Sequence, residues 1–296
     1  MSVRRQRGLV GLLLAAAILT SVATGLVIRQ ANLVRKAGNQ IAVTNASMES
    51  VRKALVDFVA LNGRLPCPSS GLLADGQPVP QIPSVNCTNT NGTVPWSVLG
   101  LSSEQVLDAW GRRLSYRVYA GNTGLTIADG ADMTNCDTDI AAPAQPAAPN
   151  RLCRGTHTTT SDPASLIGFL AYRPGLAVYD DARAPPTVTR LGFVLISHGP
   201  TGQGAWLPGG ARLALPLATN PVERANTQVR AIGSAPPAVC PMTPASVPLP
   251  PTCHNRLVSS DKTIDTPATN HFDDLVVYMT ITDLISAAGR GPRDWQ

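Results

Sequence analysis

The chain has 296 residues, of which 44% are hydrophobic and 15% are charged, and its formal net charge is +5 at pH 7. Six of the 24 basic residues flank one uncharged segment near the N-terminus, namely Arg4, Arg5, Arg7, Arg29, Arg35 and Lys36. The other 18 basic residues are balanced by 19 acidic ones. Because the basicity belongs to one short region, it does not predict a nucleic-acid-binding surface.

The uncharged segment comprises 21 residues, 8–28. Lipid hydrocarbon offers the backbone no hydrogen-bond partner, so a helix of about 20 apolar residues is needed to cross its roughly 30 Å. We predict a short basic leader at residues 1–8 and a transmembrane helix at residues 9–28. A cleaved signal peptide ending at Ser21-Val22-Ala23 and a plain signal anchor are the alternatives, although the apolar run exceeds the usual length of about 7 to 15 residues for a signal peptide.

After this segment the pattern becomes amphipathic, and the helix is predicted to continue through residues 29–61. Apolar side chains recur largely at spacings of three, four or seven, as one helix face requires. They are Ala31, Val34, Ile41, Met48, Val51, Leu55 and Phe58. Asn62-Gly63 supplies a left-handed stop, and Pro66 and Pro68 prevent the helix from resuming. A helix over residues 9–61 would be ~80 Å long, so its first half must contact lipid or other subunits.

All six cysteines lie beyond the predicted helix, in sequence rich in proline and glycine. They are Cys67, Cys87, Cys136, Cys153, Cys240 and Cys253. An even count in such sequence fits three disulfides in an oxidising compartment such as the bacterial periplasm. Sequence does not choose among the possible pairings; pairing of nearest neighbours, which closes three local loops, is the preferred one. A zinc site is disfavoured because no CxxC pair occurs and Cys253-His254 is an isolated neighbour pair.

Residues 62–296 are predicted to form a β-rich periplasmic domain. Strand-like runs bounded by turn formers lie at residues 113–119, 166–172, 191–197 and 274–281. Residues 281–288 are typical of a short helix, and the proline-rich residues 141–150 and 234–251 of extended loops. The predicted fold class is α+β: a long N-terminal helix, transmembrane and then amphipathic, packed on an antiparallel β-sheet with long disulfide-braced loops.

The chain carries no strong catalytic motif, and we expect a protein that is not an enzyme and needs no cofactor. Ser197-His198 invites a hydrolase interpretation, but neighbours in a strand point to opposite faces and cannot pair directly. A Gly-x-Ser-x-Gly elbow and a glycine-rich phosphate loop are both missing from the sequence. His157, His254 and His271 are scattered without metal-ligand spacing.

Several short landmarks occur in a characteristic order along the chain. The first are the basic residues followed by Gly8 and the uncharged segment, the Gly-Arg-Leu-Pro-Cys-Pro run at residues 63–68, and Val94-Pro95-Trp96. Asp108-Ala109-Trp110-Gly111-Arg112, Ser197-His198-Gly199-Pro200 and residues 272–277 follow. In this order they resemble the type IV pilin-like pseudopilins of bacterial type II secretion systems. Within that family they resemble a subgroup whose periplasmic domain is enlarged. The Asp-Ala-Trp-Gly segment also has a purely structural interpretation. In it the Asp108 side chain caps the local backbone, the Trp110 side chain packs against its neighbours, and Gly111 allows the chain to turn.

The resemblance implies cleavage by prepilin peptidase after Gly8, with Leu9 as a new N-terminus open to methylation. The family usually has Phe at that first mature position and Glu at the fifth, where this chain has Leu9 and Leu13. The family's Glu is thought to pair with the terminal amine of a neighbouring subunit, which Leu13 cannot do. A tip subunit of the family lacks the same Glu. The departure therefore fits a tip or initiating position, with sequence divergence as the other explanation.

The implied function is that of a structural subunit of a pseudopilus, anchored once in the bacterial inner membrane with its C-terminal domain in the periplasm. Its partners would be other pseudopilin or pilin subunits, the inner-membrane assembly platform, prepilin peptidase and the lipid bilayer. Close helix packing depends on small side chains, and the candidate packing residues are Gly11, Leu13, Ala15, Ala16 and Ala17. The alternatives are a membrane-tethered binding or adhesive domain that does not polymerise, and an anchored hydrolase.

Some members of that family bind calcium through loop carboxylates near the C-terminus. Asp261, Asp265, Asp273 and Asp274 are close enough in sequence to furnish oxygen ligands. The DxDxDG order is missing, however, and acidic residues before a strand are usually turn formers. The sequence therefore assigns no metal ligand.

Overall fold

The computed structural model describes residues 3–80, 87, 90–119, 125–126, 176–179, 187–216, 221–227, 256–258 and 272–289. For residues 3–28, 31, 190, 221–222, 224 and 256–258 it describes the helix or strand without the side chains. The predicted strand at residues 166–172 and the predicted loops at residues 141–150 and 234–251 lie outside the described residues. So do Cys136, Cys153, Cys240, Cys253, Asp261 and Asp265.

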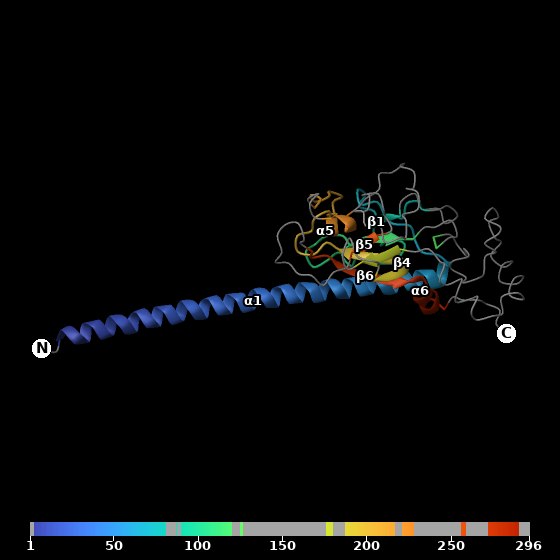
Figure 1. Cartoon of the computed structure of the whole chain (residues 1–296). Helices are drawn as coiled ribbons and strands as arrows, with labels where there is room; N and C mark the ends of the chain where they lie inside the picture. Colours follow the sequence, from blue (N-terminus) through green and yellow to red (C-terminus); the bar gives the residue numbers. More distant parts are fainter. Residues whose placement is uncertain are drawn as a thin grey trace, which may run out of the picture. The chain divides into compact units, whose positions relative to one another are not determined.

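Helix α1 covers Val3–Asn62 and continues past Arg29, as the sequence predicted (Figure 1). Gly63 ends it with a φ of 62°, the left-handed conformation that glycine adopts at low cost. Among the helices whose side chains are described, none is long and apolar enough to cross a membrane. The proposed membrane segment, residues 9–28, falls in the part of α1 without described side chains and stays a prediction.

The chain divides into two compact units, residues 1–43 and residues 44–296. The first unit is helical from residue 3 onward, and the second contains the last turns of α1 together with the described strands. The buried stripe of α1 lies in this second unit and consists of Met48, Val51, Leu55 and Val59. The predicted stripe was wrong at Phe58, which is half-buried, and at Val34 and Ile41, which are exposed. Both of the latter precede the unit that holds the sheet.

Six described strands form one sheet in the order β1-β2-β4-β3-β5, with β6 also paired to β4. They are β1 (Asn91–Thr93), β2 (Ser115–Val118), β3 (Leu176–Tyr179), β4 (Val188–Ser197), β5 (Arg256–Val258) and β6 (Leu275–Thr280). The described pairs are antiparallel except β3–β5, which is parallel. The predicted α+β class with an antiparallel sheet is thus confirmed, apart from this one pair. Strands β2, β4 and β6 were predicted; β1, β3 and β5 were not.

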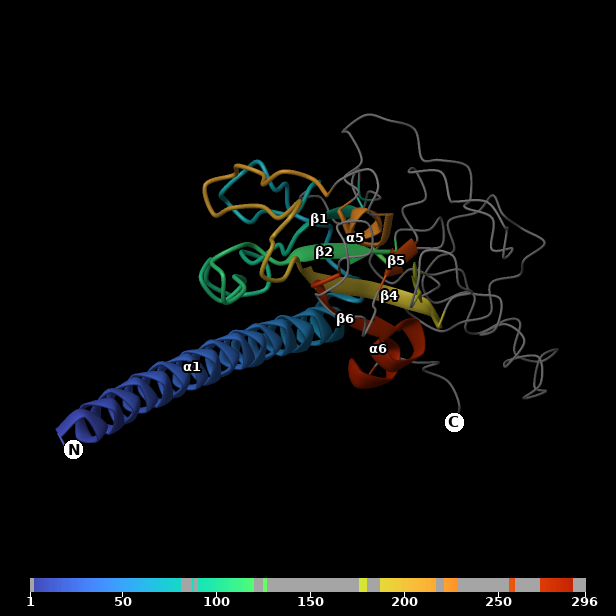
Figure 2. The same ribbon diagram turned by 60° about the vertical axis from the view of Figure 1, so that its left-hand side comes forward.

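The two faces of the sheet are covered differently. On one face Tyr116, Phe193 and Leu195 pack against the buried stripe of α1 and against helix α6 (Ile281–Ala287), and Figure 2 shows α6 beside β6 and the last turns of α1. On the other face Val194 and Ile196 form a smaller apolar cluster with residues of β3. Helix α6 lies where a short helix was predicted, and its N-cap Thr280 accepts a hydrogen bond from the Asp283 amide at 3.0 Å.

Candidate functional site

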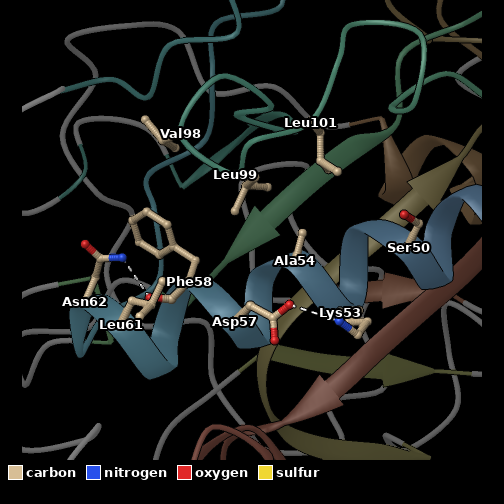
Figure 3. A pocket seen from close by; sticks show the side chains of 10 residues that line it. All are labelled: Ser50, Lys53, Ala54, Asp57, Phe58, Leu61, Asn62, Val98, Leu99 and Leu101. Atoms are coloured by element: carbon tan, nitrogen blue, oxygen red, sulfur yellow. Dashed lines mark hydrogen bonds and ion pairs between the residues drawn. The ribbon is translucent and has the colours of Figure 1, made fainter.

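A surface groove lies between the last turns of α1 and the loop that follows β1 (Figure 3). Its volume is about 320 Å³. The apolar lining consists of Ala54, Phe58, Leu61, Val98, Leu99 and Leu101. Leu61 keeps 83% of its side chain exposed, and Lys53 and Asp57 form an ion pair of 3.2 Å beside it. The groove is therefore an apolar surface with charge along one side.

Helix α1 also carries apolar side chains in solvent before residue 44. Leu33 and Val34 are 59% and 72% exposed, and Ile41 and Val43 are exposed as well. Single exposed apolar residues are ordinary, whereas these four lie within one short helical segment and give it an apolar surface. The basic residues Arg29, Arg35 and Lys36 lie among them and are exposed too.

Buried polar side chains occupy the sheet face opposite α1. Ser115 begins β2, and its hydroxyl lies 2.9 Å from His198 Nε2. His198 Nδ1 lies 3.5 Å from Asp274 Oδ1. The sequence predicted that Ser197 and His198 point to opposite faces of a strand; the structure brings Ser115 to His198 and directs Ser197 Oγ to Asp108 Oδ2 at 2.9 Å. The predicted separation of Ser197 from His198 is therefore confirmed; the contact with Ser115 was missed because it joins different strands.

The Ser115–His198–Asp274 arrangement has the order of a nucleophile, a base and an orienting carboxylate. Its geometry does not favour acyl transfer. The 3.5 Å between His198 and Asp274 is too long for a hydrogen bond. Ser115 is 6% exposed and is paired with Thr93 on one side and Ile196 on the other, so its hydroxyl stands on a regular ladder and not on a sharp exposed turn. These three side chains therefore form a polar part of the core.

Three buried carboxyl groups adjoin this network. Glu223 of helix α5 (Pro221–Asn226), Asp273 and Asp274 each place an oxygen within 4.8 Å of the others. Asp273 and Asp274 were candidates for calcium from the sequence, and the other two candidates lie outside the described residues. Glu223 was not predicted, because no spacing relates it to residues 50 positions further along the chain.

Four arginines, three of them buried and Arg212 half-buried, bind the surrounding loops. The guanidinium groups of Arg112, Arg113, Arg117 and Arg212 donate to the carbonyl oxygens of Gly199, Leu73, Asn226 and Gly204, respectively. Burial lowers the pKa of Arg117 to about 9, which leaves its guanidinium charged at neutral pH. Three of these carbonyl oxygens, those bound by Arg112, Arg113 and Arg117, belong to segments at least 40 residues away in sequence, so these contacts position long loops that have little regular structure.

The predicted disulfide framework is described in part. Cys67 and Cys87 are bonded, with sulfur atoms 2.05 Å apart, so nearest-neighbour pairing is confirmed for this pair. The processing residues Gly8 and Leu9, and the packing residues Gly11, Leu13, Ala15, Ala16 and Ala17, lie in the part of α1 whose side chains are not described.

Comparison of the chain with protein-family models, with curated proteins and with solved structures found no match. Its function must therefore be argued from its own residues.

Proposed function

We propose that this chain is a structural subunit of a pseudopilus-like fibre, assembling through helix α1. The observation that carries the proposal is the division of α1 into a stretch used for folding and a stretch left uncovered. Met48, Val51 and Leu55 are buried against the sheet, whereas Leu33 and Val34 remain largely exposed on the same helix. Apolar surface exposed on a helix this long is what a subunit needs for lateral packing in a fibre.

The contact between subunits is proposed to join two surfaces that each chain carries. The exposed apolar residues of segment 29–43 in one copy would enter the groove at the end of α1 in a second copy. The groove supplies Leu61 and Val98 for apolar contact. Its Asp57 carboxylate is already paired with Lys53 in an exposed ion pair, so the apolar residues are proposed to carry the contact. Because the two surfaces differ, such contacts repeat head to tail and build a fibre.

In this proposal residues 9–28 cross the inner membrane, and residues 62–296 lie in the periplasm. Prepilin peptidase cuts after Gly8, and small side chains such as Ala15, Ala16 and Ala17 let neighbouring helices approach closely. Leu13 places no carboxylate in the membrane, so contacts between copies are proposed to rest on helix packing and on the groove, without a carboxylate–amine pair. The Cys67–Cys87 disulfide supports the assignment of the domain to an oxidising compartment.

The mature N-terminus provides the first test. Expressed in a host with prepilin peptidase, the protein is expected to begin at Leu9, and in a host without the peptidase at Met1 or Ser2. Mass spectrometry of the N-terminal peptide distinguishes these outcomes. An N-terminus at Thr24 would contradict the proposal and indicate a secreted protein.

A matched pair of leucine substitutions tests the groove. Leu61→Glu places a charge in the groove, whereas Leu72→Glu places one on a side chain that is 63% exposed and does not line it. We expect Leu61→Glu to reduce cross-linking between differently tagged full-length copies in membranes at least about tenfold, and Leu72→Glu to leave it unchanged. Equal cross-linking by both variants would contradict the proposed contact.

A membrane-tethered binding or adhesive domain that does not polymerise is the alternative. It predicts the same anchored topology and no cross-linking between copies in the wild-type protein. The wild-type lane of the same experiment therefore separates the two functions.

A further inference from the structure

The cluster of Glu223, Asp273 and Asp274 connects two segments that are distant in the sequence. Glu223 belongs to α5, and the two aspartates precede β6. All three side chains are buried, with Glu223 only 1% exposed. Three carboxylates at this separation cannot all be ionised without large repulsion in a site of low dielectric, so the cluster must hold a proton or a cation.

The hydrogen bonds to the two aspartates, together with the raised pKa of Glu223, assign the proton to Glu223. Asp273 accepts from the backbone amide of Thr201 at 2.7 Å and from its hydroxyl at 3.0 Å. Asp274 accepts from Asn226 Nδ2 at 2.8 Å. Donors directed at both aspartates favour their ionised forms. Burial, followed by a hydrogen bond with Asp273 and the negative charges of both aspartates, raises the pKa of Glu223 to about 8.

The other charged groups around the cluster come from several elements. His198, at the end of β4, faces Asp274 with a separation of 3.5 Å. Arg117 of β2 interacts electrostatically with Asp274 and with Arg212, and donates to the carbonyl oxygen of Asn226. Arg212 binds the carbonyl oxygen of Thr227, directly after α5. Helix α5 also lies beside β5 (Figure 1). Strand β5 begins with another charged residue, Arg256, whose side chain the structure does not describe.

We propose that the docking of α5 on the segment before β6 is held by one proton, shared between Glu223 and Asp273, and that loss of this proton releases α5. The inference is independent of the proposed fibre function. It assigns a pH-sensitive contact to the domain, in which a protonated carboxyl group donates to a carboxylate across the contact.

The direction of the pH effect follows from the difference between docked and released states. In the docked state the pKa of Glu223 is about 8, and in the released, solvated state it returns to its ordinary value of 4.5. The docked state therefore binds more protons between pH 4.5 and pH 8. Docking is strongest below this range, weakens as the pH rises through it, and changes no further above it.

Hydrogen exchange of the full-length chain in a neutral detergent tests the proposal. Between about pH 5 and pH 8 the protection factors of the amides in residues 222–227, corrected for intrinsic exchange, are expected to fall by up to about tenfold per pH unit. Glu223→Gln keeps a donor to Asp273 without a titrating proton, so its protection is expected to vary little with pH. Glu104→Gln, at an exposed glutamate, is the matched control and should behave as the wild type.

Three outcomes would overturn the proposal. They are constant protection in the wild type, an unchanged pH dependence in Glu223→Gln, and loss of protection when EDTA is added at fixed pH, since the last would show that a cation balances the cluster. If Glu223→Gln does not fold, Asp273→Asn serves instead. This variant removes one negative charge beside Glu223 and is expected to move the transition to lower pH; an unmoved transition would contradict the shared proton.

Discussion

Asp108 accounts for much of the local order around the turn that leads into β2. One carboxylate oxygen accepts from the backbone amides of Trp110 and Arg112, each at 2.9 Å, and the other accepts from Ser197 Oγ at 2.9 Å. Gly111 completes the turn with a φ of 77°. The structural interpretation of the Asp-Ala-Trp-Gly segment is thus confirmed for the cap and the turn, and the bond to Ser197 adds a link to β4.

Asp108→Ala is expected to lower the free energy of unfolding by about 3 kcal/mol, because it leaves buried donors without an acceptor and removes the carboxylate 3.5 Å from Arg112 Nε. Urea unfolding followed by tryptophan fluorescence measures the change. The control is Asp57→Ala, which removes only an exposed ion pair and should cost less than about 1 kcal/mol. Similar losses in both variants would contradict this role of Asp108.

In strand β4 one extra residue, a β-bulge, changes the face of the sheet to which the following side chains point. Its pairing with β6 shifts between Leu191 and Phe193, which places Gly192 in a bulge. Leu191 consequently joins the small cluster on one face, whereas Phe193 joins the core beneath α1 and α6 on the other. A regular strand would have turned both side chains to the same face.

Gly192→Val should therefore destabilise the domain, because a Cβ at this position would lie 3.2 Å from a methyl carbon of Leu284 in α6 and the branched methyl groups would overlap it. We expect a loss of about 1–3 kcal/mol in the free energy of unfolding. Gly209→Val is the matched control, since no atom lies within 4 Å of the Cβ there. Thermal unfolding monitored by circular dichroism compares the two; a Gly192→Val protein as stable as the control would show that α6 can move aside.

At the scale of the whole molecule, the Cys67–Cys87 bond ties the chain leaving α1 to the segment before β1. The two cysteines are 20 residues apart. Cross-linking a loop of this size lowers the conformational entropy of the unfolded chain and so stabilises the folded state by about 3 kcal/mol. Of the strands that the structure describes, only β4 is longer than six residues, so the loops between them depend on such links and on arginine–carbonyl contacts.

Replacing both cysteines by alanine is expected to lower the free energy of unfolding by about 3 kcal/mol while preserving the helix content. Urea unfolding followed by far-ultraviolet circular dichroism measures both quantities. Peptide mapping of the non-reduced wild type provides the companion measurement. Finding Cys67 bonded to any cysteine other than Cys87 would contradict the structure at this point.

The sequence by itself determined those features that depend on neighbouring residues. The end of α1 at Asn62-Gly63, strands β2, β4 and β6, and helix α6 follow from local periodicity and turn chemistry. The division between the buried stripe ending at Val59 and the exposed Val34 did not follow, because both halves of α1 have similar apolar spacing.

Only the tertiary structure decided where the polar core lies. Ser115, His198, Glu223 and Asp274 come from four separate segments, and no spacing in the chain relates them. The three-residue strand β1 could not be predicted from the sequence either. Its sequence, Asn-Gly-Thr, is typical of a turn and becomes a strand only through pairing with β2. Local propensity acts over a few residues, whereas burial and charge pairing depend on which distant segments the fold brings together.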